Sequence, residues 1–325
     1  MNVLAIDGGG TSTVAVISDE FGNVYAKVVA PRSNPTAMER LEFEKTMHDL
    51  LQNLQSQNEQ AFAAVQICFA GMAGVKEKNY EFIVETIIRK YIEKESQIVI
   101  ENDALIALYS GTLGQEGIVQ IAGTGAITMG YDHDHSHVRV GGWGYLFDDE
   151  GSGYDLGVKA LQAVFQAYDG RAAETLLTKY LLKHFKVKSV PQIIDCIYSI
   201  GHPRVIVSPL SIYIIRAAEK GDEVALHILN VVCNKFLHSI KACYRRMTWN
   251  NGTIPVVLAG GVFSNVSFFI QQLKHLVKKE GLPFEVKSTR MEPVGGAVIG
   301  GLKASGVLLH QSFVESFVQN YQKEV

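Results

Sequence analysis

The stretch "AIDGGGTST", residues 5–13, places three consecutive glycines between two apolar runs. The runs NVLAI at residues 2–6 and VAVIS at residues 14–18 predict two strands joined by this turn, and VYAKVV at residues 24–29 predicts a third strand. Because glycine has no Cβ atom, such a turn lets backbone N–H groups come close to an anion. A plain hairpin turn is the alternative, and it is the more common interpretation of one isolated glycine run.

Short apolar runs alternate with long amphipathic segments along the chain, which is typical of an α/β protein. Further strands are predicted at residues 64–70 and 97–100, with helices around residues 47–54 and 80–91. Another helix is predicted to begin at Asp103, in the capping position. The chain therefore opens as an antiparallel meander and continues with alternating helices and strands.

A similar arrangement begins again after residue 115, with strands at residues 117–123 and 126–131 around a Gly-Thr-Gly turn. We interpret this repeat as the sign of an old duplication. Residues 154–250 are predicted to be mostly helical, residues 254–261 form a strand, and residues 295–306 form a closely packed helix of small residues.

The composition is that of an ordinary globular protein: 325 residues, 47% hydrophobic, 19% charged and a net charge of −3. Such a length favours two lobes over one. The charge argues against nucleic acid or a membrane surface as the main partner. The start of the chain resembles neither a signal peptide nor a membrane span, so we expect a cytoplasmic protein. The cysteines lack CxxC spacing and are interpreted as buried residues.

Three glycine turns each follow an apolar strand directly: DGGGT at residues 7–11, GTGA at residues 123–126 and LAGGVFSN at residues 258–265. No GxxxxGK[ST] pattern occurs, which excludes a P-loop. Single turns are common, whereas this ordered set is specific. The set favours phosphate binding over the plain hairpin.

This set resembles the superfamily of acetate and sugar kinases, heat-shock ATPases and actin. Within it, GGWGYLFDDEGSGYDLG at residues 141–157 and AAEKGDEVALHIL at residues 217–229 are similar to the N-acetylglucosamine kinase branch, which is shared with ATPases that activate benzoyl-CoA and hydroxyacyl-CoA reductases. The resemblance implies a two-lobed, actin-like (ribonuclease-H-like) α/β fold, each lobe a mixed sheet flanked by helices, with a cleft between the lobes. We expect the N-terminal lobe to comprise residues 1–115 plus 306–325, and the C-terminal lobe residues 116–305.

The resemblance also implies the residues that bind ATP and Mg²⁺. Asp7 approaches Mg²⁺, usually through water; its alternative role is to stabilise the turn. The first two turns cradle the phosphates, and the third borders the adenosine. The residues concerned are Gly8, Gly9, Gly10, Thr11 and Thr13 in the first turn, Gly123, Thr124 and Gly125 in the second, and Gly260, Gly261 and Asn265 in the third.

For phosphoryl transfer, the resemblance makes Asp103 the general base that takes a proton from a sugar hydroxyl. Its alternative role is that of a helix N-cap, which contributes about 1 kcal/mol. The residues that correspond to sugar-binding positions are Asn34, Asp103, Gly142, Trp143, Gly144 and Asp149. Taken alone, Asn34 would be read as a turn residue and Trp143 as a core residue.

Two departures from the family pattern lie beside the expected sugar. Ala126 and Ile127 stand where the turn usually continues with serine, and Asp148 stands where a glycine usually precedes the matching Asp149. N-acetylglucosamine, N-acetylmuramic acid and glucosamine therefore all stay open as the sugar. His133, His135 and His137 could lie on one face of a strand, but we interpret them as a polar hairpin tip and assign them no ligand.

These patterns favour an ATP-dependent amino-sugar kinase that phosphorylates a hydroxyl group, most simply the 6-hydroxyl. A reductase-activating ATPase with a protein partner is the alternative, and it would need an iron–sulfur cluster held by cysteines across a dimer interface. A non-catalytic sugar sensor is a third reading, but the first turn begins at residue 7 and leaves no room before it for a DNA-binding helix-turn-helix. A homodimer stays open.

Overall fold

The computed structural model describes residues 1–323 except 78, 133–135, 200–202 and 251, and it does not describe the side chains of residues 264–266. The chain divides into two compact units. The first unit comprises Met1–Gln115 and Thr289–Val325, and the second comprises Glu116–Ser288. Each unit holds one five-stranded mixed sheet flanked by helices, which confirms the predicted fold class.

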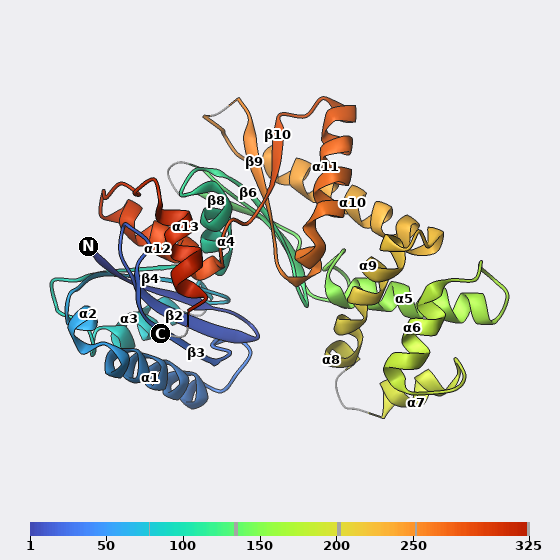
Figure 1. The fold of residues 1–325 in the computed structure, drawn as a ribbon, viewed down its shortest axis with the longest axis horizontal. Coiled ribbons are helices and arrows are strands. Elements are labelled where there is room, and N and C mark those ends of the chain that lie inside the picture. Colours follow the sequence, from blue (N-terminus) through green and yellow to red (C-terminus); the bar gives the residue numbers. More distant parts are fainter. Residues whose placement is uncertain (78, 133–135, 200–202, 251, 324–325) are drawn as a thin grey trace. The chain divides into compact units, whose positions relative to one another are not determined.

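The sheet of the first unit has the order β3-β2-β1-β4-β5 (Figure 1). The strands are β1 (Asn2–Gly8), β2 (Ser12–Ser18), β3 (Val24–Pro31), β4 (Val65–Met72) and β5 (Gln97–Glu101). β1 pairs with β2, and β2 with β3, in antiparallel fashion, whereas β1–β4 and β4–β5 are parallel. The antiparallel meander predicted for the start of the chain is therefore present.

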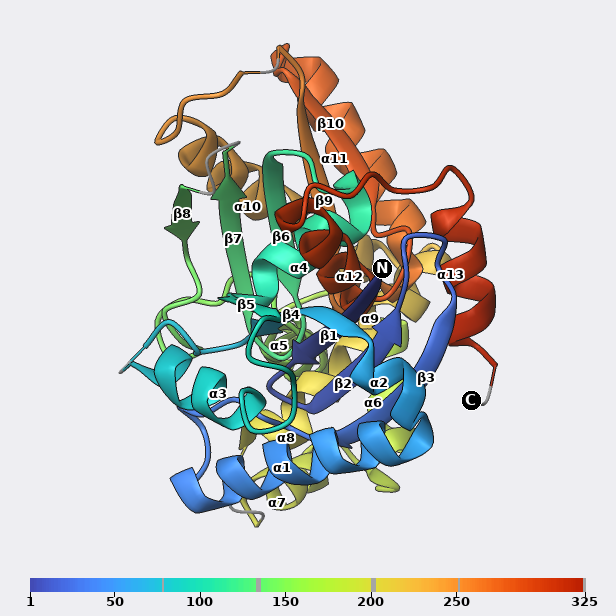
Figure 2. The same ribbon diagram turned by 90° about the vertical axis from the view of Figure 1, so that its left-hand side faces the viewer.

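Helices cover both faces of this sheet (Figure 2). The helices are α1 (Arg40–Gln57), α2 (Glu59–Ala63), α3 (Tyr80–Ile88), α4 (Asp103–Thr112), α12 (Pro293–Ala304) and α13 (Phe313–Tyr321). Leu4 and Ile6 of β1 belong to the core cluster that contains α1 and α3. Because strand side chains alternate between faces, Val3 points to the opposite face, where it meets Gly301 of α12.

Residues 289–305 belong to the first unit, whereas we expected them in the second. The reason is the packing of α12, whose small residues allow an unusually close approach. A Cβ atom on Gly296 would lie 1.9 Å from the carbonyl oxygen of Ile106 in α4, and one on Gly300 would lie 2.7 Å from the ring of Phe69 in β4. The predicted helix of small residues is thus present, and its partners are α4 and the first sheet.

The sheet of the second unit repeats the topology of the first, in the order β10-β9-β6-β7-β8. The strands are β6 (Gly117–Ala122), β7 (Ala126–Tyr131), β8 (His137–Val140), β9 (Ile254–Ala259) and β10 (Phe284–Ser288). β6, β7 and β8 are antiparallel neighbours, and β6–β9 and β9–β10 are parallel. β6 therefore takes the place of β1, which supports the duplication inferred from the sequence.

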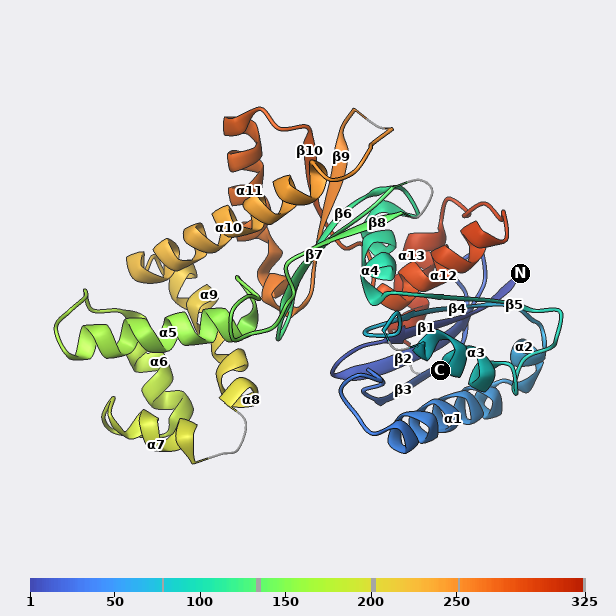
Figure 3. The ribbon, with the colours of Figure 1, turned by 180° about the vertical axis from the view of Figure 1, so that it is seen from behind.

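The helices of the second unit include a group that stands apart from its sheet (Figure 3). The helical elements are α5 (Gly153–Tyr168), α6 (Leu176–Phe185), α7 (Gln192–Tyr198), α8 (Pro203–Val207), η1 (Ser208–Leu210), α9 (Ser211–Glu219), α10 (Glu223–Tyr244), η2 (Gly261–Asn265) and α11 (Val266–Glu280). α10 packs on β6, β7 and β8, and α5, α6 and α9 pack on one another. Among the described residues, no helix is long and apolar enough to span a membrane.

Candidate functional site

The first glycine turn joins β1 to β2, where Gly8 pairs with Thr13. The turn is closed by a hydrogen bond from the N–H of Gly9 to the carbonyl of Ser12, at 3.0 Å. A Cβ atom on Gly10 would meet nothing within 4 Å, and Thr11 is exposed. Packing within the protein therefore does not require glycine at position 10, and the turn presents an open stretch of backbone.

Thr13 does not add a hydroxyl to this open stretch, contrary to our expectation. Its side chain is fully buried, and its Oγ1 lies 2.8 Å from the carbonyl oxygen of Pro31 and 2.7 Å from Oγ of Ser33. Thr13 is the first residue of β2 to pair with β1 beyond the turn, so its side chain points inward. Its hydroxyl group joins β2 to the end of β3.

Two carboxylates of the first unit, those of Asp103 and Glu292, act on Asp7. Asp7 lies at the end of β1, Asp103 is the first residue of α4, and Glu292 is the residue before α12. Burial, together with the charges of Asp103 and Glu292, raises the pKa of Asp7 to about 7. Asp7 and Asp103, the two acids singled out in the sequence, are therefore close enough for the charge of Asp103 to act on Asp7. Glu292 was missed, although its place immediately before a proline that starts a glycine-rich helix offered a signal.

Asp103 is not the N-cap of α4. The N-cap is Asn102, whose Oδ1 accepts the N–H of Ala104 at 2.9 Å. Burial raises the pKa of Asp103 to about 6, and hydrogen bonds from the backbone of Ala104 and of Asp103 itself oppose this rise. A carboxyl group with such a pKa is suited to exchange protons near neutral pH.

Asn34 forms the turn that its sequence context suggested. Its Oδ1 accepts the N–H of Thr36 at 3.0 Å and the hydroxyl of Thr36 at 2.7 Å. A Cβ atom on Gly74, which has a positive φ of 72°, would lie 2.6 Å from Oδ1 of Asn34. The loop after β4 therefore approaches Asn34 closely, and the carboxamide oxygen is engaged in the turn.

The second glycine turn joins β6 to β7 in the same way. The N–H of Gly123 donates to the carbonyl of Gly125 at 2.8 Å, and the N–H of Gly153 donates to the carbonyl of Gly123 at 2.7 Å. A Cβ atom on Gly123 would meet nothing within 4 Å, and Thr124 is exposed. This turn, like the first, presents open backbone, and it lies at the beginning of α5.

The third glycine turn follows β9 and lies against the end of β6, next to the second turn. Gly260 has a φ of 103°, and a Cβ atom on it would lie 2.5 Å from the carbonyl oxygen of Ala122. Glycine is therefore required at position 260 by both conformation and space. Gly261 has open space beside it. The side chain of Asn265 lies outside the described part of the structure.

The loop after β8 presents Trp143 to solvent. Gly142 and Gly144 have φ values of 75° and 116°, and the indole of Trp143 is 62% exposed. The guanidinium of Arg139 lies 4.2 Å from the centre of its ring. Oδ2 of Asp148 accepts the N–H of Trp143 at 3.0 Å. Asp148, one of the departures from the family pattern, thus holds the Trp143 loop in place.

Asp149 lies behind the second glycine turn and is 5% exposed. A Cβ atom on Gly125 would lie 2.9 Å from its Oδ2. Burial raises its pKa, while backbone hydrogen bonds from Gly144 and the charge of Arg204 oppose the rise. Arg204 of α8 forms an ion pair with Asp149 at 3.5 Å. Sequence reasoning missed Arg204, because nothing in the local pattern near residue 204 links it to Asp149.

Ala126 and Ile127, which form the other departure from the family pattern, contact the same region. The backbone of Ala126 is a hydrogen-bond donor to the carboxylate of Asp149. A Cβ atom on Gly142 would lie 2.9 Å from Cβ of Ile127, so Ile127 packs directly against the Trp143 loop. Ala126, Ile127 and Asp148 therefore all support the region that carries Trp143 and Asp149.

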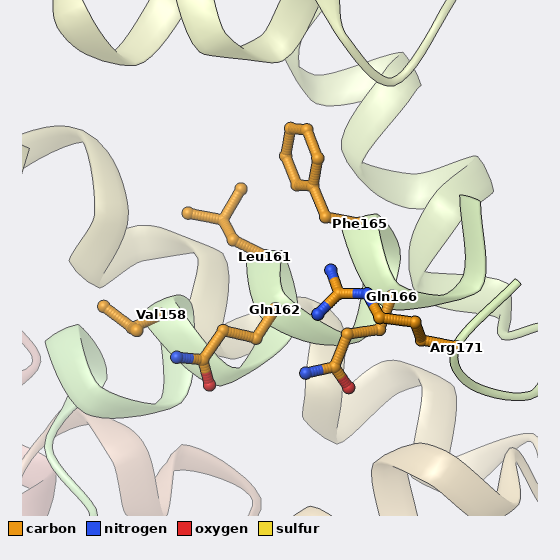
Figure 4. Close-up of a pocket in the computed structure, with 6 residues that line it drawn as sticks. All are labelled: Val158, Leu161, Gln162, Phe165, Gln166 and Arg171. Atoms are coloured by element: carbon orange, nitrogen blue, oxygen red, sulfur yellow. The ribbon is translucent and has the colours of Figure 1, made fainter. Parts of the chain in front are cut away.

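Two hollows of the second unit lie away from the glycine turns and the Trp143 loop. One, of about 470 Å³, runs along α5 and is lined by Val158, Leu161, Gln162, Phe165, Gln166 and Arg171 (Figure 4). Another, of about 610 Å³, lies between α5 and α6 and includes Tyr168, Glu174 and Lys179. Neither contains a residue that the sequence analysis assigned to a site.

Among the described residues, the histidines and cysteines noted in the sequence form no cluster that could bind a metal. His133 and His135 lie outside the described residues, and His137 begins β8 with its ring 5.8 Å from that of Tyr131. Cys233 and Cys243 are buried in the core of the second unit. Within the described ranges, no three His, Cys, Asp or Glu residues are grouped so that they could hold a metal by themselves.

The residues around Asp7 nevertheless fit a magnesium ion that arrives with phosphates. Mg²⁺ usually takes one or two protein carboxylates and completes its shell with water and phosphate oxygens. The pKa of Asp7 is raised mainly by burial and further by the negative charges of Asp103 and Glu292, and a divalent cation beside the carboxylate would oppose both effects.

Comparison with known proteins gives matches over nearly the whole chain. The model of the BadF/BadG/BcrA/BcrD ATPase family matches residues 4–301. The chain is 30% identical over 297 residues to an N-acetylmuramic acid/N-acetylglucosamine kinase of Clostridium acetobutylicum, covering 91% of this chain and 97% of that protein. It is 27% identical over 320 residues to an N-acetyl-D-glucosamine kinase of Dictyostelium discoideum, covering 93% and 98%.

The fold is also similar to a solved structure, that of a candidate N-acetylglucosamine kinase from Porphyromonas gingivalis. The TM-score is 0.72 at 21% identity, and the alignment covers 94% of this chain and 100% of that chain. At 21% identity, this structural similarity supports the fold alone. The sequence matches extend through both units.

Proposed function

The chain belongs to the BadF/BadG/BcrA/BcrD ATPase family, and from that premise we propose that it is an ATP-dependent amino-sugar kinase. It transfers the γ-phosphoryl group of ATP to a hydroxyl group, the 6-hydroxyl, of N-acetylglucosamine or a close relative such as N-acetylmuramic acid or glucosamine. The relatives in Clostridium and Dictyostelium are named as kinases of such sugars, which supports this assignment.

The observation that carries the proposal is the state of Asp103. Because Asn102 caps α4, Asp103 is not needed as the capping side chain, and its pKa is raised to about 6 by burial. A general base is most effective when its pKa lies near the working pH. We assign Asp103 the role of accepting the proton of the attacking sugar hydroxyl.

The two hairpin turns are assigned to the phosphates of ATP. Gly10 and Gly123 have open space where a Cβ atom would stand, at equivalent places in the two sheets. The backbone N–H of Gly10, with the exposed hydroxyls of Thr11 and Thr124, can donate hydrogen bonds to phosphate oxygens, whereas the N–H of Gly123 closes its own turn. Asp7 would hold Mg²⁺ through water, and the ion would neutralise charge that develops on the phosphates.

The sugar is assigned to the Trp143 loop, Asp149 and Asn34. The exposed indole of Trp143 offers a flat apolar surface for a sugar ring, and the carboxylate of Asp149 can accept hydrogen bonds from ring hydroxyls. Asn34 has its carboxamide oxygen engaged with Thr36, so its NH₂ group is the part that would contact a ligand.

The alternative, a reductase-activating ATPase, is not favoured by the positions of the cysteines. Cys233 and Cys243 are enclosed in the core, and burial raises the pKa of both thiols to about 12. Cluster ligation requires thiolates, which such surroundings disfavour.

The experiment that tests the proposed function is ADP release from Mg-ATP, measured with N-acetylglucosamine, N-acetylmuramic acid, glucosamine and glucose. We expect turnover that depends on an amino sugar and is lost in Asp103→Asn. Release of ADP at the same rate with and without sugar would contradict the proposal and point to an ATPase that acts with a protein partner.

A further inference from the structure

The side chain of Arg204 lies among three groups of the second unit. Its guanidinium is 3.5 Å from the carboxylate of Asp149 and 5.2 Å from the centre of the Tyr145 ring. A Cβ atom on Gly125 would lie 3.0 Å from its terminal nitrogen, so the guanidinium occupies the space beside Gly125 of the second glycine turn. The side chain is 32% exposed, and a ligand can therefore reach it.

This guanidinium is incompletely satisfied. An arginine side chain carries five N–H donors, and an unpaired buried donor destabilises the folded protein. Nε of Arg204 is buried and makes no hydrogen bond in the described part of the chain. The ion pair with Asp149, at 3.5 Å, is longer than a good charge-assisted hydrogen bond.

A second polar atom in the same short stretch is also unsatisfied. The hydroxyl of Ser208 is buried without a hydrogen-bond partner among the described residues. Ser208 follows Arg204 by four positions along α8 and η1, so the two residues share a face of that helical segment. Both unsatisfied atoms therefore belong to the one short helical stretch that carries Arg204.

We propose that Arg204 is a specificity-determining residue that binds a carboxylate carried by the sugar substrate, so that the site accepts an anionic amino sugar such as N-acetylmuramic acid. The inference rests on the proposed function and assigns a recognition residue within it. N-acetylmuramic acid differs from N-acetylglucosamine by a lactyl ether that ends in a carboxylate. That group is the chemistry that a guanidinium beside a sugar-binding loop would select.

The charge around Arg204 favours a carboxylate over a phosphoryl group, although the planar guanidinium fork matches both in bidentate fashion. The charges of Asp148 and Asp149 are close, since Asp148 raises the pKa of Asp149, and they oppose the approach of a dianion more than that of a monoanion. A phosphate of ATP is nevertheless the rival ligand, because Arg204 adjoins Gly125 of the second turn.

The test compares kcat/KM for N-acetylmuramic acid, its uncharged methyl ester and N-acetylglucosamine in the full-length protein. The variants are Arg204→Gln, Arg204→Lys and the control Arg216→Gln. Arg216 is an exposed arginine of α9 whose guanidinium lies 5.8 Å from the ring of Tyr213. Because each variant is judged by the ratio between two sugars, a general loss of folded protein cancels out.

In Arg204→Gln we expect the ratio of kcat/KM for N-acetylmuramic acid to that for N-acetylglucosamine to fall about 10- to 100-fold, the effect of losing a charged hydrogen-bond partner. Arg204→Lys should recover part of the ratio, because it keeps the charge but not the fork. The methyl ester should be insensitive to all three variants. Arg216→Gln should leave every ratio unchanged.

An unchanged ratio in Arg204→Gln overturns the inference. If Arg204→Gln lowers kcat/KM equally for every sugar and also raises the KM for ATP, Arg204 binds a phosphate group instead, and the inference is overturned. A wild-type protein that phosphorylates N-acetylglucosamine but not N-acetylmuramic acid overturns it while the kinase assignment stands. A wild-type protein that phosphorylates no amino sugar instead contradicts the proposed function itself.

Discussion

Asn102 accepts the backbone N–H of Ala104 at 2.9 Å, and the residue that follows it, Asp103, is thereby released from the capping role. The two adjacent side chains therefore divide the structural and chemical tasks at the start of α4. This division makes the two roles separable by substitution.

Asn102→Ala should lower the free energy of unfolding by about 1 kcal/mol, as expected for the loss of an N-cap. Asp103→Asn should lower kcat by a factor of about 10² to 10⁴, as expected for the loss of a general base, without the loss of stability seen in Asn102→Ala. Urea unfolding and the sugar-dependent release of ADP measure the two effects. A large loss of stability in Asp103→Asn would show that the carboxylate supports the fold.

A second prediction concerns Asp7 and pH. Its pKa is raised from an ordinary value near 3.8 to about 7, so ionisation costs more in the folded than in the unfolded state. The folded state retains the proton between these values, and the protein loses stability as pH rises through this window. The penalty is complete above pH 7 and absent below pH 4.

Asp7→Asn removes this penalty. At pH 8 it should raise the free energy of unfolding by up to about 4 kcal/mol, the value that a shift of about three pKa units implies, and the gain should shrink toward zero as pH falls to 4. Urea titrations of both proteins across this range provide the measurement. If Asp7→Asn and the wild type were equally stable at pH 8, neither burial nor the charges of Asp103 and Glu292 would raise the pKa of Asp7 as described. We expect the substitution to impair ATP use at the same time.

The sequence could predict what depends on local pattern. The alternation in β1 and β2 and the glycines between them indicated the hairpin, and the resemblance pointed to Asp7 and Asp103. Contacts between distant segments were not visible in that pattern. The inward orientation of Thr13 depends on β3, and the partnership of Arg204 with Asp149 depends on α8 packing behind the second turn.

The boundary of the first unit also depends on contacts between segments that are distant in the sequence. Residues 289–305 follow the second sheet in the chain, and their small residues indicated a packed helix without naming its partner. Only the space between α4 and β4 decides where a helix with Gly296 and Gly300 fits.

The third prediction separates two threonines of the first turn. Thr13→Val should lower the free energy of unfolding by about 1–2 kcal/mol, because the buried hydroxyl of Ser33 and the carbonyl of Pro31 lose their partner. Thr11→Val should leave stability unchanged, because Thr11 is exposed, and should raise the KM for ATP if its hydroxyl meets a phosphate. Thermal unfolding and steady-state kinetics measure the two quantities. If instead Thr13→Val raised the KM for ATP and Thr11→Val lowered the stability, the Thr13 hydroxyl would lie at the nucleotide.

The last prediction uses the empty space beside Gly10. Gly10→Ala introduces a methyl group that meets no protein atom within 4 Å, at a residue whose φ is not positive, so the melting temperature should stay that of the wild type. The same methyl group would stand where phosphates approach the turn, and the KM for ATP should rise about tenfold as hydrogen bonds to the phosphates lengthen.

Two further glycine substitutions serve as controls. Gly252→Ala has equally open surroundings away from the three turns and should change neither quantity. Gly296→Ala would place a methyl group 1.9 Å from the carbonyl oxygen of Ile106 and should cost about 1–3 kcal/mol of stability. An unchanged KM for ATP in Gly10→Ala would mean that the opening at the first turn does not receive the nucleotide.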